Sequence, residues 1–241
     1  MRNNNKENFT IGVLGGMGTY ATIHLFQKYA SVFEAEKEWE RPRIIIDNRC
    51  TMPSRVRAFL YNENVERLVF EMTDSLHTLI NAGCTHIVLA CNTSHLFLPK
   101  IYENEPEIEQ YINNLVISCV EKIVSDGLKE VFLLGTEGTI ESCIYQDALA
   151  SKDVKCLCPS PREYSMIRRC IEAVKQNKYS DEIKEIFLDL INRYDSCILG
   201  CTELPVLYEM YYADIKTKLV YDPVMICLKN IKCIYDLARS E

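Results

Sequence analysis

The sequence lacks any long run of hydrophobic residues. No segment approaches the roughly 20 consecutive apolar residues that a membrane-spanning helix needs. The first ten residues, MRNNNKENFT, are polar and do not contain the apolar stretch of a secretory signal. We therefore expect a short disordered tail, a cytoplasmic protein and no membrane partner.

Positive charge is also scarce. The chain has 27 Lys and Arg residues against 34 Asp and Glu residues, which gives a formal net charge of −7, and its longest basic run is the pair Arg168 and Arg169. Nucleic-acid binding needs clustered positive charge, so this composition argues against a nucleic-acid partner. The chain also lacks a low-complexity stretch and a Gly/Ser linker.

Cysteine, by contrast, is abundant, with 12 residues. In a chain of this length with no secretory signal, they do not predict a disulfide framework. Cys170, Cys197, Cys227 and Cys233 lie in apolar runs, so we expect small buried side chains there. The CxC pair at 156–158 has no second pair at metal-site spacing, so no metal site is predicted.

Strand-like apolar runs alternate with segments of helical period along most of the chain. This alternation, with strands that read as buried on both faces, predicts an α/β fold with a parallel sheet. Strands are expected near 9–15, 43–47, 85–90, 114–118, 130–135, 153–157, 195–200 and 218–221. Helices are expected over 20–36, 62–82, 93–102, 119–127, 139–150, 162–178, 181–193, 203–212 and 223–239.

The pattern also allows two domains. The passage 104–113 is the expected crossing between them, and the chain would cross back near 213–218. The first domain would then comprise 1–110 and 219–241, and the second 111–218.

One junction occurs twice. In VLACNTSH (88–95) and CILGCTEL (197–204), a strand-like run ends in a cysteine, and a helical segment follows. Ligands of parallel sheets bind beyond the carboxyl ends of the strands. Cys91 and Cys201 would therefore reach the same edge, where the start of a helix lowers the pKa of a thiol.

Two such thiols on opposite sides of one carbon could remove a proton from one face and deliver a proton to the other. That is the chemistry of inverting a stereocentre. The alternatives are two buried core cysteines, since cysteine is often buried, and a redox pair, for which the spacing is unlike CxxC.

The first predicted strand ends in the glycine-rich segment IGVLGGMG. Gly12, Gly15, Gly16 and Gly18 do not fit GxGxxG. A dinucleotide site that uses Asp47 as its acidic residue remains an alternative of a different class.

The motifs GVLGGMG, ACNTSH and LGCTELP, in this order, resemble the aspartate/glutamate racemase superfamily, in its branch of aspartate and broad-specificity amino acid racemases. DNRCTMPSR (47–55), LLGTEGTIESCIY (133–145) and VYDP (220–223) extend the resemblance over nearly the whole chain. It implies two similar α/β domains, each with a mainly parallel sheet flanked by helices, an active site in the cleft between them, no cofactor such as pyridoxal phosphate, and a homodimer.

Carried onto this sequence, the resemblance makes Cys91 and Cys201 the catalytic pair. Arg55 in MPSR and Lys175 in EAVK would bind the distal carboxylate of an acidic amino acid. The other substrate-binding residues that it implies are Asn92, Thr93, Thr202, Thr136, Met17 and Asn48. His95 either tunes the Cys91 thiol or has a structural role, and His86 is expected to be packed in the core.

The sequence departs from the family pattern at two positions. Thr19 replaces a proline after GGMG, and Ser54 replaces the aspartate of the family's Pro-Asp-Arg. The second change makes aspartate specificity less certain. We therefore expect an amino acid racemase, with a hydantoin racemase or small-carboxylate isomerase, or a non-catalytic ligand- or nucleotide-binding module, as alternatives.

Overall fold

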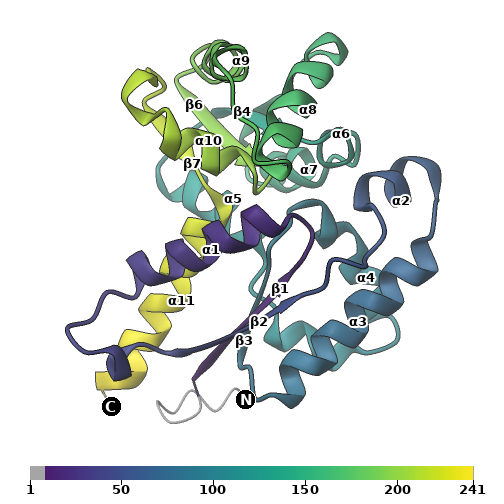
Figure 1. Cartoon of the computed structure of the whole chain (residues 1–241), viewed down its shortest axis with the longest axis vertical. Helices are drawn as coiled ribbons and strands as arrows, with labels where there is room; N and C mark the ends of the chain where they lie inside the picture. The colour runs from purple at the N-terminus through teal and green to yellow at the C-terminus, as the bar shows by residue number, and fades with distance from the viewer. Residues whose placement is uncertain (1–8, 241) are drawn as a thin grey trace.

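The computed structural model describes residues 9–240, and it contains two parallel β-sheets with helices on both faces of each (Figure 1). This confirms the α/β fold predicted from the alternating pattern. The tail expected at the N-terminus falls largely on residues 1–8, outside the described residues.

The first sheet has the strand order β2-β1-β3. Its strands are β1 (Thr10–Gly15), β2 (Arg43–Asn48) and β3 (His86–Leu89). The chain segments that accompany it are α1 (Thr19–Val32), η2 (Glu38–Glu40), α2 (Arg55–Tyr61), α3 (Val65–Asn81), η3 (Thr93–Phe97), α4 (Leu98–Tyr102) and η4 (Pro106–Tyr111). On α3, the side chains of Leu68, Met72, Leu76 and Leu79 are all fully buried, as their helical spacing predicts.

The second sheet has the order β5-β4-β6-β7. Its strands are β4 (Glu130–Gly135), β5 (Lys155–Leu157), β6 (Ser196–Gly200) and β7 (Leu219–Tyr221). Its accompanying segments are α5 (Leu115–Ser125), α6 (Glu137–Glu141), α7 (Ile144–Ala150), α8 (Pro161–Lys175), α9 (Asp181–Ile191), α10 (Leu204–Met210) and η5 (Tyr212–Asp214). The last helix, α11 (Pro223–Ser240), packs against α1 and α5.

Some local predictions differ from the structure. The segment 114–118 is not a strand: the Asn114 side chain accepts hydrogen bonds from the backbone N–H groups of Val116 and Ile117, at 2.9 and 3.1 Å, and so caps α5. Helix α2 was not predicted, and it begins at Arg55 after the capping residue Ser54.

The strand at 219–221, expected to return to the first domain, instead pairs in parallel with β6. Only after Asp222 does the chain rejoin the first sheet, because Val224, Cys227, Leu228 and Ile231 of α11 share a core with β1 and α1. We propose a domain division with its last boundary near Asp222.

Charged side chains connect the two halves. Lys28 of α1 is buried and forms ion pairs with Asp222 and with Glu209 of α10. The Nε2 atom of His24 lies 2.7 Å from Oε2 of the same Glu209. These contacts hold α1 against the second half of the chain beside the start of α11.

The twelve cysteines are all free thiols. Cys170, Cys197 and Cys227 are buried as predicted, whereas Cys233 is exposed, because it lies on the solvent side of α11. Among residues 9–240 there is no helix long and apolar enough to cross a membrane.

Candidate active site

The two repeated junctions lie against each other. Cys91 follows β3 and Cys201 follows β6, and the hydroxyl of Thr202 donates to the carbonyl of Ala90 at 3.2 Å. Both cysteines line one small cavity of about 50 Å³. Its lining residues are Met17, Ser54, Arg55, Val56, Cys91, Asn92, Thr93, Thr136, Lys175, Cys201, Thr202 and Glu203.

Cys201 has a carboxylate partner. Its thiol donates to Glu203 Oε2 at 2.8 Å, and both side chains are buried. Burial raises the pKa of Cys201 well above its ordinary value, and the neighbouring carboxylate raises it further, while Lys175 acts in the opposite direction. This is contrary to the lowered pKa expected from the start of a helix, because burial and a nearby negative charge outweigh the helix end.

Cys91 has a different environment. Its side chain is partly exposed, and its backbone carbonyl accepts hydrogen bonds from Ser94 Oγ at 2.7 Å and His95 Nδ1 at 3.0 Å. The other ring nitrogen of His95 accepts from the backbone N–H of Leu115 at 3.2 Å. Burial lowers the pKa of His95 to about 4, so its neutral ring is engaged by the backbone and has a structural role.

His86 is also packed in the core. Its ring is fully buried and stacks on Phe9 with the centroids 4.3 Å apart.

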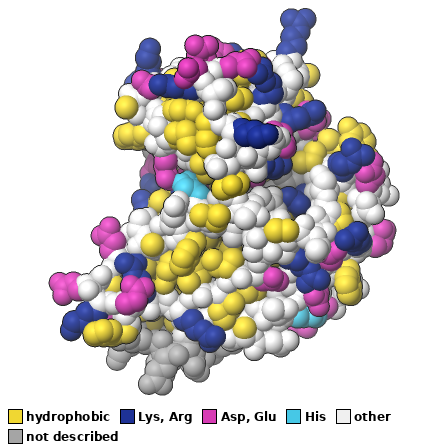
Figure 2. All heavy atoms as spheres, in the orientation of Figure 1, with side chains coloured by type: hydrophobic (Ala, Val, Ile, Leu, Met, Phe, Trp, Pro, Cys, Tyr) yellow, Lys and Arg dark blue, Asp and Glu magenta, His cyan; other side chains and the backbone are white. Residues whose placement is uncertain are grey.

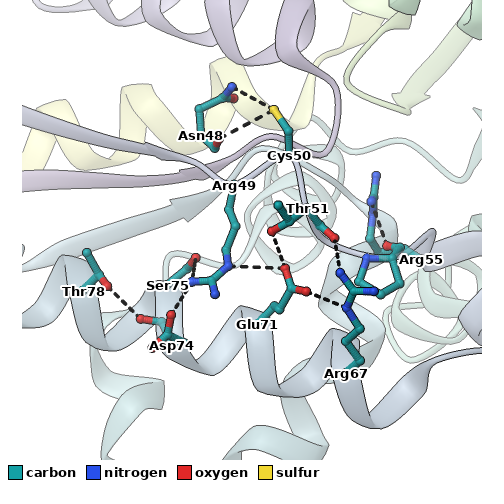
Figure 3. Close-up of polar contacts among 11 residues, drawn as sticks. Asn48, Arg49, Cys50, Thr51, Arg55, Arg67, Glu71, Asp74, Ser75 and Thr78 are labelled. Atoms are coloured by element: carbon teal, nitrogen blue, oxygen red, sulfur yellow. Dashed lines mark hydrogen bonds and ion pairs between the residues drawn. The ribbon is translucent and has the colours of Figure 1, made fainter.

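A network on α3 holds the loop that carries Arg55. The buried Glu71 carboxylate accepts hydrogen bonds from Thr51 Oγ1 at 2.6 Å and from Arg67 Nε at 2.8 Å (Figure 3). Arg49 reaches the same helix, where it contacts Glu71, Asp74 and Ser75 (Figure 3). Between β2 and α2, the backbone is therefore fastened to α3 at both Arg49 and Thr51.

Arg55 retains hydrogen-bond donors. Its Nη1 donates to the carbonyl of Pro53 at 3.0 Å and its Nη2 to the carbonyl of Met17 at 2.7 Å. The Nε–H is buried and has no partner among the described residues. Since a guanidinium has five N–H donors, an entering carboxylate would find unused ones.

Asn92 presents a second unused donor. Tyr145, fully buried, donates to Asn92 Oδ1 at 2.6 Å, whereas Asn92 Nδ2 is buried without a partner in the described structure. The tyrosine therefore determines which end of the amide is left for a ligand.

Hydroxyl groups complete the wall. Thr93 Oγ1 lies 3.1 Å from Thr136 Oγ1 and 3.0 Å from Thr139 Oγ1. Thr136 also caps α6, because its hydroxyl accepts from the Thr139 backbone N–H at 3.2 Å.

Lys175 ends α8 and lines the same cavity. Its ammonium donates to Glu172 Oε1 at 3.1 Å. Although burial lowers its pKa, the charge of Glu203 and the hydrogen bond to Glu172 raise it, and the net direction is upward. The lysine therefore stays cationic beside the buried carboxylate.

The glycine-rich segment is explained by close packing. Gly16 has φ +77°, and a Cβ on it would lie 2.3 Å from the Arg49 carbonyl carbon. A Cβ on Gly18 would lie 2.3 Å from Glu203 Oε1. The glycines thus let the first strand's loop approach the 48–55 loop and Glu203.

Of the ten predicted site residues, the structure brings nine to this cavity, and Asn48 is the exception. Asn48 instead donates to Cys50 Sγ at 3.2 Å (Figure 3). The sequence reasoning missed Glu203 and Val56, and it considered Ser54 only as a departure from the family pattern. One signal was available in the sequence: Glu203 lies two residues after Cys201, and Ser54 and Val56 flank Arg55. Residues next to a site residue at the start of a short helix often line the same cavity.

The chain is similar to proteins of a known family. A family model described as Asp/Glu/Hydantoin racemase matches residues 14–231. The broad specificity amino-acid racemase RacX of Bacillus subtilis (strain 168) is 24% identical in an alignment of 216 residues that covers 85% of this chain and 90% of that protein.

Solved structures show the same fold. The Picrophilus torridus aspartate racemase superposes with a TM-score of 0.78 at 24% identity, over 95% of this chain and 99% of that one. An aspartate racemase homologue from Pyrococcus horikoshii OT3 has a TM-score of 0.72 at 25% identity, over 96% and 99% of the two chains. Because the family model covers most of its length, the chain belongs to the Asp/Glu/hydantoin racemase family, and it is an isomerase acting on amino acids.

Proposed function

We propose that the enzyme racemises aspartate or a related amino acid without pyridoxal phosphate, using Cys91 and Cys201 as its two bases. The observation that carries this proposal is that two cysteines 110 positions apart in the sequence line one cavity beside unused hydrogen-bond donors. A pair of core cysteines would not require that arrangement.

The reaction needs one thiolate and one thiol. The thiolate takes the proton from Cα, so the Cα–H bond breaks and an S–H bond forms. The electron pair left on Cα then takes a proton from the opposite thiol, whose S–H bond breaks. The product has the inverted configuration, and the two sulfur atoms have exchanged protonation states.

The polar groups of the cavity suit a zwitterionic substrate. The free donors of Asn92 and Arg55 and the ammonium of Lys175 favour carboxylates. With a net charge of −7, the enzyme must concentrate positive charge locally to bind an acidic amino acid, and Arg55 and Lys175 supply it. Thr93, Thr136 and Thr202 offer hydroxyl groups to the α-carboxylate and amine.

A larger groove offers the route to this cavity. It has a volume of about 410 Å³ and shares the lining residues Ser54, Val56, Thr136 and Lys175 with the smaller cavity. An amino acid would enter between α2, α6 and α8, whose residues form the walls of this groove.

The direct test follows deuterium. In D₂O, L- and D-aspartate should each give product with solvent deuterium at Cα, and chiral chromatography should show racemisation. Cys91→Ala and Cys201→Ala should each abolish racemisation while the circular dichroism spectrum is unchanged. Normal racemisation by either folded variant would overturn the two-base assignment.

A second candidate is a sister activity on a substrate without a distal carboxylate, such as a hydantoin. Ser54 supports it, because it lines the cavity at the position where the family's Pro-Asp-Arg pattern has an aspartate. A screen of enantiomer pairs and hydantoins on the unmodified enzyme would separate the two candidates.

We also propose that the enzyme works as a homodimer in the cytoplasm. An exposed apolar stripe on α1 supports the dimer, since Tyr20, Ile23 and Phe26 are 39%, 49% and 46% exposed.

A further inference from the structure

The two cysteines differ in the partner of the thiol group. Cys201 donates its thiol hydrogen to a buried carboxylate, whereas no carboxylate is hydrogen-bonded to Cys91 Sγ in the described part of the chain. Glu203 is only 2% exposed, and its second oxygen, Oε1, is buried without a partner among those residues. A buried carboxylate held in this way needs a hydrogen on its neighbour.

We infer that Glu203 is a positioning residue that keeps Cys201 protonated in the resting enzyme, so that Cys201 begins as the proton donor and Cys91 as the base. This inference rests on the proposed two-cysteine mechanism and adds an order to it. It also assigns Glu203 a role that is separate from substrate binding.

Electrostatics supports the assignment. If Cys201 lost its proton, a thiolate would face a carboxylate inside a buried space, and two like charges at hydrogen-bond distance are strongly unfavourable. The charged groups that face the pair from other elements are Lys175 of α8 and Arg55 of α2, both lining the same cavity. Lys175 lowers the pKa of Cys201 and so opposes the effect of Glu203, but its ammonium also donates a hydrogen bond to Glu172.

The same geometry determines how the starting protonation state is restored after turnover. After Cys91 has taken the Cα proton and Cys201 has given up its own, the new Cys201 thiolate lies beside Glu203. Its charge repulsion with the carboxylate favours return of a proton to Cys201 from solvent, while the Cys91 thiol releases one. These two transfers restore the starting state without an oxidant or another reactant.

The test measures the ionisation of each thiol separately. Purified enzyme is alkylated with iodoacetamide over a range of pH, and the labelling rates of the Cys91 and Cys201 peptides are read by mass spectrometry. The midpoint of each peptide's labelling-rate curve against pH is then compared between the two cysteines. Exposure changes the height of such a curve and leaves its midpoint in place. In the unmodified enzyme, the midpoint of Cys201 should lie above that of Cys91.

Glu203→Gln keeps the shape of the side chain and removes its charge. It should lower the Cys201 midpoint by about one pH unit or more and leave the Cys91 midpoint in place. The alkaline limb of the kcat/KM profile should move to lower pH by a similar amount, because Cys201 then loses its proton more easily. Glu203→Asp, which keeps the charge, should retain a higher midpoint than the glutamine variant.

Glu121→Gln, at an exposed position of α5, is the control for a change in net charge and should shift neither midpoint. A Cys201 midpoint that is unchanged in Glu203→Gln, or that lies below that of Cys91 in the unmodified enzyme, would overturn the inference. The alkylation readout does not require turnover. If the enzyme racemises no amino acid but the midpoints behave as expected, the proposed function fails and the role of Glu203 stands.

Discussion

At the scale of single residues, charge and hydrogen bonding distinguish side chains that the motifs present as equivalents. Cys91 and Cys201 occupy matching positions in a repeated junction, yet a carboxylate contacts only the second thiol within the described chain. Arg55 and Asn92 each use part of their hydrogen-bonding capacity on the protein and leave a buried donor unused. Buried groups of this kind are costly unless a ligand satisfies them.

We expect substrate specificity to depend on Arg55. Arg55→Ala should raise KM for aspartate by roughly 10- to 100-fold, because charge-assisted hydrogen bonds to a carboxylate contribute about 1.5–3 kcal/mol. Alanine racemisation, if present, should change little, since alanine has no distal carboxylate. Arg169→Ala is the matched control: this arginine is exposed, pairs with Glu182 and lines neither the cavity nor the groove. Equal losses for aspartate and alanine would exclude a distal-carboxylate role.

At the scale of elements, the starts of short helices position Cys201, Glu203 and Arg55 at the cavity. Helix α10 begins directly after Glu203, and α2 begins at Arg55 after the capping Ser54. The loop between β2 and α2 has little regular structure of its own, and its contacts with α3 take the place of a sheet or helix ladder (Figure 3).

The buried Glu71 is therefore expected to matter for stability and for KM. Glu71→Gln should lower the free energy of unfolding by about 2 kcal/mol and raise KM, because Arg55 loses its fixed position. Urea unfolding and steady-state kinetics measure the two effects. Glu66→Gln, at an exposed position of the same helix, should be nearly neutral.

The same pair of variants gives a pH dependence. Hydrogen bonds from Thr51 and Arg67 lower the pKa of Glu71 below its ordinary value. Its folded pKa thus lies below its unfolded pKa, so the stabilisation is complete above the unfolded value and is lost as the pH falls through the folded value. The stability difference between the unmodified enzyme and Glu71→Gln should accordingly shrink in acid. A constant difference from pH 7 to pH 3 would contradict this account.

At the scale of the whole molecule, the two sheets meet where the repeated junctions touch, and α1 and α11 lie across the join (Figure 1). The buried Lys28 pairs with Asp222 and Glu209 in that region. On its outer side, α1 carries Tyr20, Ile23 and Phe26 at spacings of three residues, and Figure 2 shows hydrophobic side chains gathered on this face.

A dimer that covers this stripe should be sensitive to charge. Analytical ultracentrifugation should give twice the chain mass of 27.9 kDa for the unmodified enzyme and a single chain mass for Phe26→Asp or Ile23→Asp. Burying an unpaired carboxylate in an apolar interface is strongly unfavourable. Phe70→Asp is the control, since Phe70 is 67% exposed but lies on α3. A monomeric unmodified enzyme, or a dimer that survives both α1 substitutions, would exclude this interface.

Much of the molecule followed from the sequence, because its signals are local. Alternating apolar runs predicted seven of the seven observed strands, and the repeated strand–cysteine–helix pattern placed both thiols at the edge where parallel strands end. The extra strand at 114–118 failed, because a helix buried by its neighbours has the same apolar composition as a strand and the Asn114 cap decides between them.

Tertiary structure alone decided the electrostatic character of the site. The sequence indicated a helix start that should acidify Cys201. The direction of its pKa shift is instead set by burial in a core that β4, β6, α8 and α9 form together, and by Glu203. Likewise, the unused donors of Arg55 and Asn92 exist because Met17, Pro53 and Tyr145 satisfy the rest of each group. Periodicity indicates which way a side chain faces, whereas its charge state also depends on burial by elements that lie far along the chain.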